Sequence, residues 1–460
     1  MRYRRSIFCS VTLFGLLAGI VSAQETPNLD SLRLGSRYLR WAPANGDAPA
    51  AAAPTPLAST SPVPPTVESA TTQGMSLADW ETLAEQNNPT LAQAAARIQA
   101  ARADYVQAGL YPNPRVGYQA TEIGDEGQAG QQGAFIGQEV VTNGKLRRNR
   151  ELAAQVVRQL ECAWASQHGR VVSDVRHAFY DVLVAQRTLE LTDQLVRIGQ
   201  EGVRAADGLL KAKEVSRVDV LQAKIEADSA QILAQKARNR YSAAWRNLAV
   251  VAGLPNTPPA SLSGDLQDGL SLLTWDEALG RVLSESPVAA EAQNGIAKAQ
   301  AALARECAQQ VPNIDLQAGL QYDNASRDTI AGIQVGMPVP LFNRNQGNIR
   351  RAQAELATAR AEVRRVDLDL QQRLAVAFEQ YQNARCQVEK FAGDILPNAQ
   401  TSLDLVAAGY RQGEFNYVTL LTAQRTFFQV NLAYVEAIRD LRSATIAIEG
   451  NLLSDSLQQR

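Results

Sequence analysis

Two segments in the second half of the chain alternate between apolar and polar or small residues over the length of a single β-strand. A period of two places successive side chains on opposite faces, so the pattern predicts a hairpin with one apolar and one largely polar face. A polar turn at 324–328 separates the two segments. The apolar-face positions are Ile314, Leu316, Ala318, Leu320 and Tyr322 in the first segment and Thr329, Ala331, Ile333, Val335 and Met337 in the second.

The first half of the chain carries a weaker version of this hairpin. Its turn, at 124–133, is longer and rich in glycine and glutamine. A soluble hairpin packed on a helix would show the same alternation, so one hairpin alone does not decide its surroundings. The apolar positions are Val116, Tyr118 and Ala120 on the first strand and Ala134, Ile136 and Val140 on the second.

Long helical patterns follow both hairpins, at 145–207 and 344–408. They are rich in alanine and carry leucine and valine at heptad-like spacing, which predicts coiled-coil packing against partner helices. At 1.5 Å per residue, each would extend about 95 Å. Pro397 would kink or end the second helix near its far end. A short turn then leads to a last helix in each half, at 215–251 and 415–453.

Helices also precede both hairpins. Ser76 and Thr274 are predicted N-caps, each with an acidic residue three positions later, which is the spacing of a capping box. We expect one helix to run from Ser76 to about Leu110 and another from Thr274 to about Gln310.

The matching patterns form an internal repeat of about 200 residues. The pair Pro-Asn at 112–113 recurs at 312–313, and VDVLQA at 218–223 recurs as VTLLTA at 418–423. Both recur at the same offset and in the same order, so the sequence predicts one architecture built from two similar halves.

The composition agrees with long packed helices. Hydrophobic residues make up 45% of the chain, which excludes wholesale disorder, whereas charged residues make up 20% and aromatic residues 6%. The 45 basic and 47 acidic residues give a net charge of −2. A chain with this balance has no broad positive field for nucleic acid or anionic lipid, so nucleic acid is not an expected partner.

The N-terminus predicts export. An apolar run at 7–23 follows three arginines and ends in Val-Ser-Ala, the pattern of a cleaved signal peptide; an ordinary signal is favoured over a twin-arginine signal. No later segment has the ~20 apolar residues of a spanning helix. The chain is therefore expected to be periplasmic, secreted or an outer-membrane β-barrel protein.

The remaining segments complete the predicted organisation. A proline- and alanine-rich stretch should be an extended tether. Cys162, Cys307 and Cys386 are expected to be small, partly buried side chains, with a disulfide between two of them as the alternative. The predicted parts are a signal peptide at 1–23, a linker at 24–74, a first repeat at 75–255, an inter-repeat linker at 256–272, a second repeat at 273–454 and a tail at 455–460.

Two hairpins at equivalent places in an exported chain favour strands that span a membrane. Their lengths suit tilted transmembrane strands of ~9–11 residues. Four strands cannot close a barrel, however, and an open edge in lipid leaves backbone groups unsatisfied at several kcal/mol each. Either the strands lie outside the membrane or several chains share one barrel.

Taken together, these motifs resemble the TolC family of trimeric outer-membrane efflux ducts over about residues 75–453. The segments QEVVTNGK at 138–145 and PVPLFNRNQG at 338–347 resemble the cobalt-zinc-cadmium type of heavy-metal efflux component. Pro338 and Pro340 suit neither a strand ladder nor a helix interior, so they are expected to mark the swivel from barrel to tunnel. Gly144 is the candidate for that role in the first half.

The resemblance implies a mainly α fold with a small β part. Each chain of a homotrimer would give four strands to a twelve-stranded transmembrane β-barrel and its long helices to a periplasmic coiled-coil tunnel. The implied setting is the outer membrane and its lipid in a Gram-negative-type bacterium. A periplasmic adaptor and an inner-membrane pump, most simply of the resistance-nodulation-division type, would deliver heavy-metal cations for passive conduction, without enzyme activity or cofactor.

The turns at 208–218 and 409–418 should form the mouth of the tunnel. Threefold repetition of Asp219 would place three carboxylates in a ring, which favours cations and can gate a narrow pore. An equal alternative is an acid that stabilises the start of a helix. The other mouth residues are Gln222 and, where the best-known members of the family carry aspartates, Thr419 and Thr422, so a second acidic ring is in doubt.

Two alternatives to a heavy-metal duct stay open. One is the same duct for drugs or for type I protein secretion, and the other is a periplasmic coiled-coil structural or adaptor protein with soluble hairpins. His177 shares a helix face with Asp174 and Asp181, which would suit a metal contact, but a solvated helix face is the favoured interpretation. No arrangement typical of a catalytic nucleophile or a phosphate-binding loop is evident.

Overall fold

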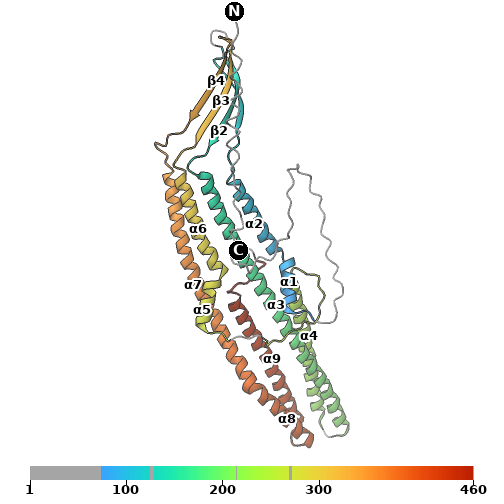
Figure 1. Ribbon diagram of the computed structural model, residues 1–460. Helices are drawn as coiled ribbons and strands as arrows, with labels where there is room; N and C mark the ends of the chain where they lie inside the picture. Colours follow the sequence, from blue (N-terminus) through green and yellow to red (C-terminus); the bar gives the residue numbers. More distant parts are fainter. Residues whose placement is uncertain (1–73, 125–128, 214, 269–271, 459–460) are drawn as a thin grey trace, which may run out of the picture. The chain divides into compact units, whose positions relative to one another are not determined.

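The computed structural model describes residues 74–124, 129–213, 215–268 and 272–458. The predicted signal peptide and nearly all of the predicted N-terminal linker lie outside the described residues. The described part is mainly helical and contains one four-stranded antiparallel sheet (Figure 1), which confirms the predicted fold class. Within it, no helix is both long enough and apolar enough to cross a membrane.

The same order of elements occurs in both halves, as expected for a duplicated chain. In the first half it is α1 (Leu77–Asn87), α2 (Pro89–Gln107), β1 (Arg115–Thr121), β2 (Gln131–Val140), α3 (Lys145–Lys211) and α4 (Arg217–Val251). In the second half it is α5 (Trp275–Glu285), α6 (Pro287–Ala308), β3 (Ile314–Asp323), β4 (Thr329–Gly336), α7 (Gln346–Lys390), η3 (Phe391–Ile395), α8 (Leu396–Gln412) and α9 (Tyr417–Glu449).

The prediction that each half opens with one continuous helix is wrong. Asn88 is extended, and its side chain accepts a hydrogen bond from the Thr90 backbone N–H and so caps α2. Pro89 is the first residue of α2, a position where its missing N–H costs nothing. The Asn88 amide also donates to the Val251 carbonyl at 2.9 Å, which ties the break to the end of α4. Ser286 and the proline after it produce the equivalent break between α5 and α6.

The second long helix does not end at Pro397 or at the residue before it. It passes through a π-helical turn, η3, and continues as α8 to Gln412. Pro397 lies in the first turn of α8, where it disturbs the hydrogen-bond ladder least. The three described cysteines are free, with Cys162 half-buried and the other two exposed, so the disulfide alternative is not realised.

Each half has its own hydrophobic core at an equivalent place. In the first half, α1 packs on α3 and α4, and Trp80 meets Trp245 edge to face with ring centroids 5.7 Å apart. In the second half, α5 packs on α7 and α9, where Leu374, Tyr381 and Ile448 are buried. The repeat in the sequence therefore corresponds to two similarly packed cores.

The segment at 256–272, predicted as a linker, packs closely on the helices where it is described. Leu262 is buried in the first core and forms a β-bridge with Met75. The buried Arg442 side chain lies over the ring of Tyr180 and donates to the Leu266 carbonyl. This segment therefore fastens the two halves to each other, in addition to joining them along the chain.

Candidate functional site

The apolar positions predicted for the strands lie on one face of the sheet, except Met337, which follows the end of β4. The strand order is β1-β2-β3-β4, and directly opposed residues of antiparallel neighbours share a face. One row across the sheet is Val116, Ile136, Ala318 and Ile333, and the next is Tyr118, Ala134, Leu320 and Ala331. Ile314 and Leu316 of β3, with Val335 of β4, belong to the same face further along, and Tyr322 lies at its other end.

This apolar face is uncovered in the single chain. Val116 is 77% exposed and Ile333 is 79% exposed, although both are large aliphatic residues within strands. A contiguous patch of this kind normally marks a surface for lipid or protein. The two outer strands, β1 and β4, each have one edge without a partner among the described residues.

The opposite face of the sheet is largely polar. The ring of Phe135 covers Gly117, where a Cβ would lie 2.6 Å from the ring atoms, so a larger residue there would displace the ring. The polar residues of this face include Gln119, Gln317, Gln321, Asp315 and Gln334. The sheet thus separates an apolar surface from a polar one.

The first transition from strand to helix is short and is held by Asn313. Only the four residues 141–144 join β2 to α3, and both Asn143 and Gly144 are left-handed, with φ of 55° and 62°. The Asn313 amide oxygen accepts from the Lys145 ammonium at 2.6 Å, and its NH2 group donates to the Glu139 carboxylate at 2.6 Å. Gly144 lies in this turn, but the side-chain contacts centre on Asn313.

Lys145 is one of the few buried charged residues, with 6% of its surface exposed. Burial lowers the pKa of Lys145, and the nearby Glu139 carboxylate opposes that shift. Asn313 separates the two charges and hydrogen-bonds to both. The arrangement satisfies a lysine that would be costly to bury alone.

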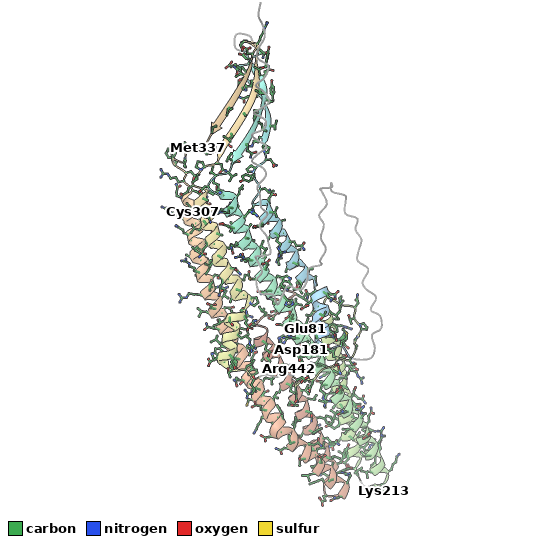
Figure 2. All side chains as sticks on the ribbon, in the orientation of Figure 1. Glu81, Asp181, Lys213, Cys307, Met337 and Arg442 are labelled. Carbon is green, nitrogen blue, oxygen red and sulfur yellow. The ribbon has the colours of Figure 1, made fainter. Side chains whose placement is uncertain are left out.

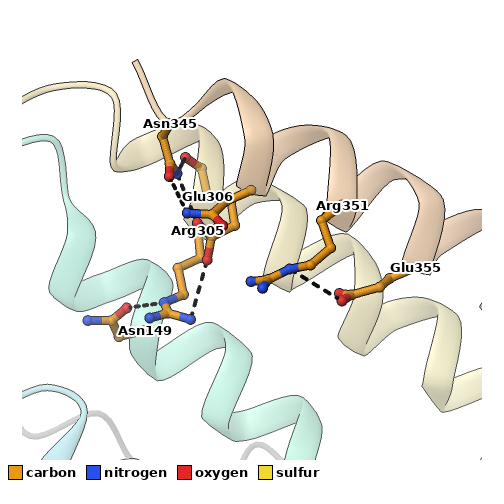
Figure 3. A network of polar contacts seen from close by, with 7 residues as sticks. Asn149, Arg305, Glu306, Asn345, Arg351 and Glu355 are labelled. Atoms are coloured by element: carbon orange, nitrogen blue, oxygen red, sulfur yellow. Dashed lines mark hydrogen bonds and ion pairs between the residues drawn. The ribbon is translucent and has the colours of Figure 1, made fainter. Parts of the chain in front are cut away.

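The second transition is longer and is held by Asn345 (Figure 3). The nine residues 337–345 join β4 to α7 and include Pro338 and Pro340. Asn345 is left-handed, with φ of 60°, and its side-chain NH2 group donates to the carbonyl and carboxylate oxygens of Glu306, each at 2.8 Å. Arg305 extends the network from α6 to Asn149 of α3. The prolines interrupt the strand, whereas the asparagine fixes the helix start.

At the other end of the helices, Asp219 caps α4. Its carboxylate accepts from the backbone N–H and the hydroxyl of Ser216 at 2.9 and 2.8 Å, which forms a capping box. Hydrogen bonds from Ser216 lower the pKa of Asp219, so the carboxylate is charged at neutral pH. Only one of the two carboxylate oxygens is used in these contacts. Asp219 thus stabilises the start of a helix, as the alternative interpretation of the sequence expected. One of its carboxylate oxygens stays available for other contacts.

The second half repeats this helix start without the charge. Asn416 caps α9 through the Thr419 backbone N–H at 2.9 Å, so Thr419 takes the place that Asp219 has in α4. The Thr422 hydroxyl donates to the Val418 carbonyl within the helix. Gln222, the remaining predicted mouth residue, is exposed on α4.

An ion pair near the mouth was not predicted from the sequence. Arg425 of α9 binds Glu226 of α4, so it connects the last helices of the two halves. The ring of Tyr417 packs nearby against Val220 and Ala223 of α4. These partners are about 200 residues apart along the chain, and no local pattern links them.

The order of elements and the two-faced sheet can be compared with known proteins. The family model for outer membrane efflux proteins matches residues 80–254 and 278–452, one copy in each half of the chain. The chain belongs to the outer membrane efflux protein family. This membership confirms the predicted duplication and the predicted role as an efflux channel of tripartite systems. The channels of this family are not enzymes, as predicted. The membership also overturns the alternative of a soluble coiled-coil adaptor.

Individual relatives of this outer membrane efflux protein agree with the assignment. The cobalt-zinc-cadmium resistance protein CzcC of Cupriavidus metallidurans is 27% identical over 368 residues, which cover 80% of this chain and 87% of the relative. The outer membrane efflux protein BepC of Brucella suis biovar 1 is 29% identical over 301 residues, 61% of this chain and 63% of the relative. The crystal structure of CusC matches with a TM-score of 0.69 at 19% identity, covering 82% of this chain and 92% of that one.

His177 of this efflux protein lies between helices and is not on a solvated face as predicted. It is half-buried, and its Nδ1 atom is 3.4 Å from the Ser443 hydroxyl of α9. Asp174, its supposed metal partner, accepts hydrogen bonds from the backbone N–H groups of Asp455 and Ser456. Within the described ranges, no group of histidine, cysteine and acidic residues is arranged to hold a metal ion.

We expect His177 to make the helical part less stable in mild acid. Burial lowers the pKa of His177, and Asp181 and Asp174 only partly oppose this, so the unfolded chain takes up a proton more readily than the folded one. The stability is therefore complete above the ordinary histidine pKa of about 6.5 and falls as the pH drops below it. Urea unfolding followed by circular dichroism at about pH 7 and pH 5 should show a smaller difference for His177→Gln than for the wild type. His168→Gln is the control, and an unchanged difference in His177→Gln would refute the assignment.

Proposed function

We propose that three copies of this chain share one twelve-stranded transmembrane barrel. The observation that carries the proposal is the four-stranded sheet, with its uncovered apolar face and its two edges without partners. Pairing of β1 in one copy with β4 in the next would satisfy every edge, as lipid requires. The apolar face would then meet lipid, and the polar face with its glutamines would line a water-filled lumen.

In the same proposal, the long helices form a tunnel through the periplasm. The protein would be exported by its cleaved signal peptide to the outer membrane of a Gram-negative-type bacterium. The helix α3 has 67 residues and would extend about 100 Å at 1.5 Å per residue, a length suited to reach far from the membrane. An inner-membrane pump, most simply of the resistance-nodulation-division type, and a periplasmic adaptor would feed the mouth formed by the α3–α4 and α8–α9 turns.

The proposed cargo is a heavy-metal cation. The relationship to a cobalt-zinc-cadmium resistance protein over 80% of the chain supports this choice. Deletion of the gene should lower the tolerated concentration of cobalt, zinc or cadmium several-fold and leave tolerance to hydrophobic drugs unchanged. Growth of the deleted and complemented strains in graded concentrations of each compound provides the measurement. Loss of drug tolerance alone would favour the drug-efflux alternative.

The proposed gate is a ring of three Asp219 carboxylates at the mouth. Because a ring of negative charge attracts divalent cations in a narrow pore, Asp219→Asn should weaken the block of ion current by divalent cations. Single-channel recording in planar bilayers provides the measurement. Ser216→Ala is the matched control, since it removes the hydroxyl that completes the cap and keeps the charge. Equal effects of both variants would assign Asp219 to capping alone.

A further inference from the structure

The connection between β4 and α7 presents large apolar side chains to solvent. Phe342 is 92% exposed, and Met337, Val339 and Leu341 are also exposed. Figure 2 shows Met337 at the level where the strands give way to the helices. We call residues 337–344, together with Arg350 and Arg351 of α7, the collar.

The collar is held in its exposed position by hydrogen bonds. The Gln346 side chain donates to the Phe342 carbonyl at 3.1 Å and accepts from the Arg344 backbone N–H at 2.8 Å. Asn345, the residue after Arg344, hydrogen-bonds to Glu306 of α6. The outward position of Phe342 is therefore part of the folded arrangement.

Cations follow the apolar residues along the chain. Arg344 and Arg350 have no ion-pair partner in the described part of the chain, and Arg351 approaches Glu355 at 3.6 Å. The sequence has no acidic residue between Asp328 and Glu355. Glu306 of α6 also borders this surface, but it pairs with Arg305 at 3.5 Å, so the surface keeps an excess of positive charge.

A neighbouring copy of the chain offers no counter-charge for this surface. In the proposed trimer, β4 lies beside β1 of the next copy, so the facing connection is the one between α2 and β1. That stretch has no acidic residue between Asp104 and Glu122, and it contributes the exposed Arg115 and Tyr111. The neighbour would extend the collar without neutralising it.

We propose that the collar binds the headgroups of anionic phospholipid in the periplasmic leaflet of the outer membrane. Going from sheet to helix, the order of exposed groups is aliphatic residues, then Phe342, then arginines, which matches the passage from acyl chains to phosphates. The inference rests on the proposed placement of the strands in the membrane. Beyond that placement, the inference states that the protein prefers negatively charged lipid, and it names the residues that produce this preference.

The test uses the full-length protein in phosphatidylcholine vesicles that contain trace spin-labelled lipid. Electron spin resonance measures how much of each labelled lipid is immobilised by the protein. We expect phosphatidylglycerol to be preferred over phosphatidylcholine by at least about fivefold, because each cation close to an anionic surface contributes roughly that factor. The double variant Arg344→Gln/Arg350→Gln should reduce this preference to less than about twofold. Arg327→Gln, at the opposite end of the β3–β4 hairpin, is the matched control and should keep the preference.

A charge-conserving variant and a fluorescent reporter complete the design. Arg344→Lys/Arg350→Lys should retain the preference, which separates loss of charge from a folding defect. Phe342→Trp should give more tryptophan fluorescence than the wild type. Lipids that are brominated near the headgroup should quench this additional fluorescence.

The outcomes separate this inference from the function proposed above. If no labelled lipid is immobilised, the membrane placement of the strands itself fails. Immobilised lipid with no headgroup preference in the wild type, or a preference that survives the glutamine variant, would overturn the inference and leave the channel intact. Loss of the trimer on native gels with an unchanged lipid preference would instead assign the collar to subunit contact, which also overturns it.

Discussion

Asn313→Ala should destabilise the helical part of the protein by about 2–4 kcal/mol, because it removes the shared partner of a buried lysine and a carboxylate. Without the amide, the Lys145 ammonium keeps its burial and loses its hydrogen bond to Asn313. The first strand-to-helix transition has only four residues, so it has little freedom to supply another partner. Chemical unfolding of the detergent-purified protein, followed by far-ultraviolet circular dichroism, provides the measurement.

The duplication supplies a matched control for this substitution. Asn113 occupies the equivalent place in the first half, but it is exposed, and its side chain makes no hydrogen bond within the described ranges. Asn113→Ala should therefore change the free energy of unfolding by less than about 0.5 kcal/mol, as for most surface substitutions. Equal losses for Asn113→Ala and Asn313→Ala would show that the contacts of Asn313 contribute little.

Ile333→Arg should prevent most of the protein from assembling in the outer membrane. Ile333 lies in the row across the middle of the apolar face, where the proposed barrel is surrounded by hydrocarbon. An arginine at the midplane of a membrane barrel costs about 2–4 kcal/mol per chain, and three chains share the barrel in the proposed trimer. The measurement is the fraction of protein recovered from outer membranes as an assembled oligomer on native gels.

The neighbouring residue of the same strand tests the face assignment. Gln334 is also exposed in the single chain but belongs to the polar face, so Gln334→Arg would place its charge in the aqueous lumen. Normal assembly of Gln334→Arg alongside failure of Ile333→Arg is the expected result. The reverse pattern would show that the apolar face points inward.

The strands were predictable because their pattern is local. Alternation at Ile314 to Tyr322 fixes which side chains share a face before any partner strand is known. The helix breaks were not predicted, although their signals are present: Pro89 and Pro287 each begin a helix, and each follows a residue that suits an N-cap. A continuous helical pattern on both sides concealed the boundary.

The contacts that organise the transitions and the mouth could not be predicted from local patterns. Asn313 was recognised as a repeated position, but its partners, Glu139 and Lys145, are about 170 residues away along the chain. Arg425 and Glu226 are similarly distant. Hydrogen bonds and ion pairs of this kind depend on which helices become neighbours, and that follows from the whole fold. The chemistry of Asp219, by contrast, is contained in four consecutive residues from Ser216.

The unequal lengths of the two transitions have a consequence for symmetry. Duplication gives the proposed trimer six hairpins, and six equal connections would allow a nearly sixfold ring at the membrane boundary. Each chain instead supplies one connection of four residues and one of nine, so short and long connections alternate around the ring. The short connections constrain the helices that they join, and the long ones leave room for lateral displacement. Any rotation or dilation of the tunnel relative to the barrel should therefore be threefold, with α7 moving more freely than α3.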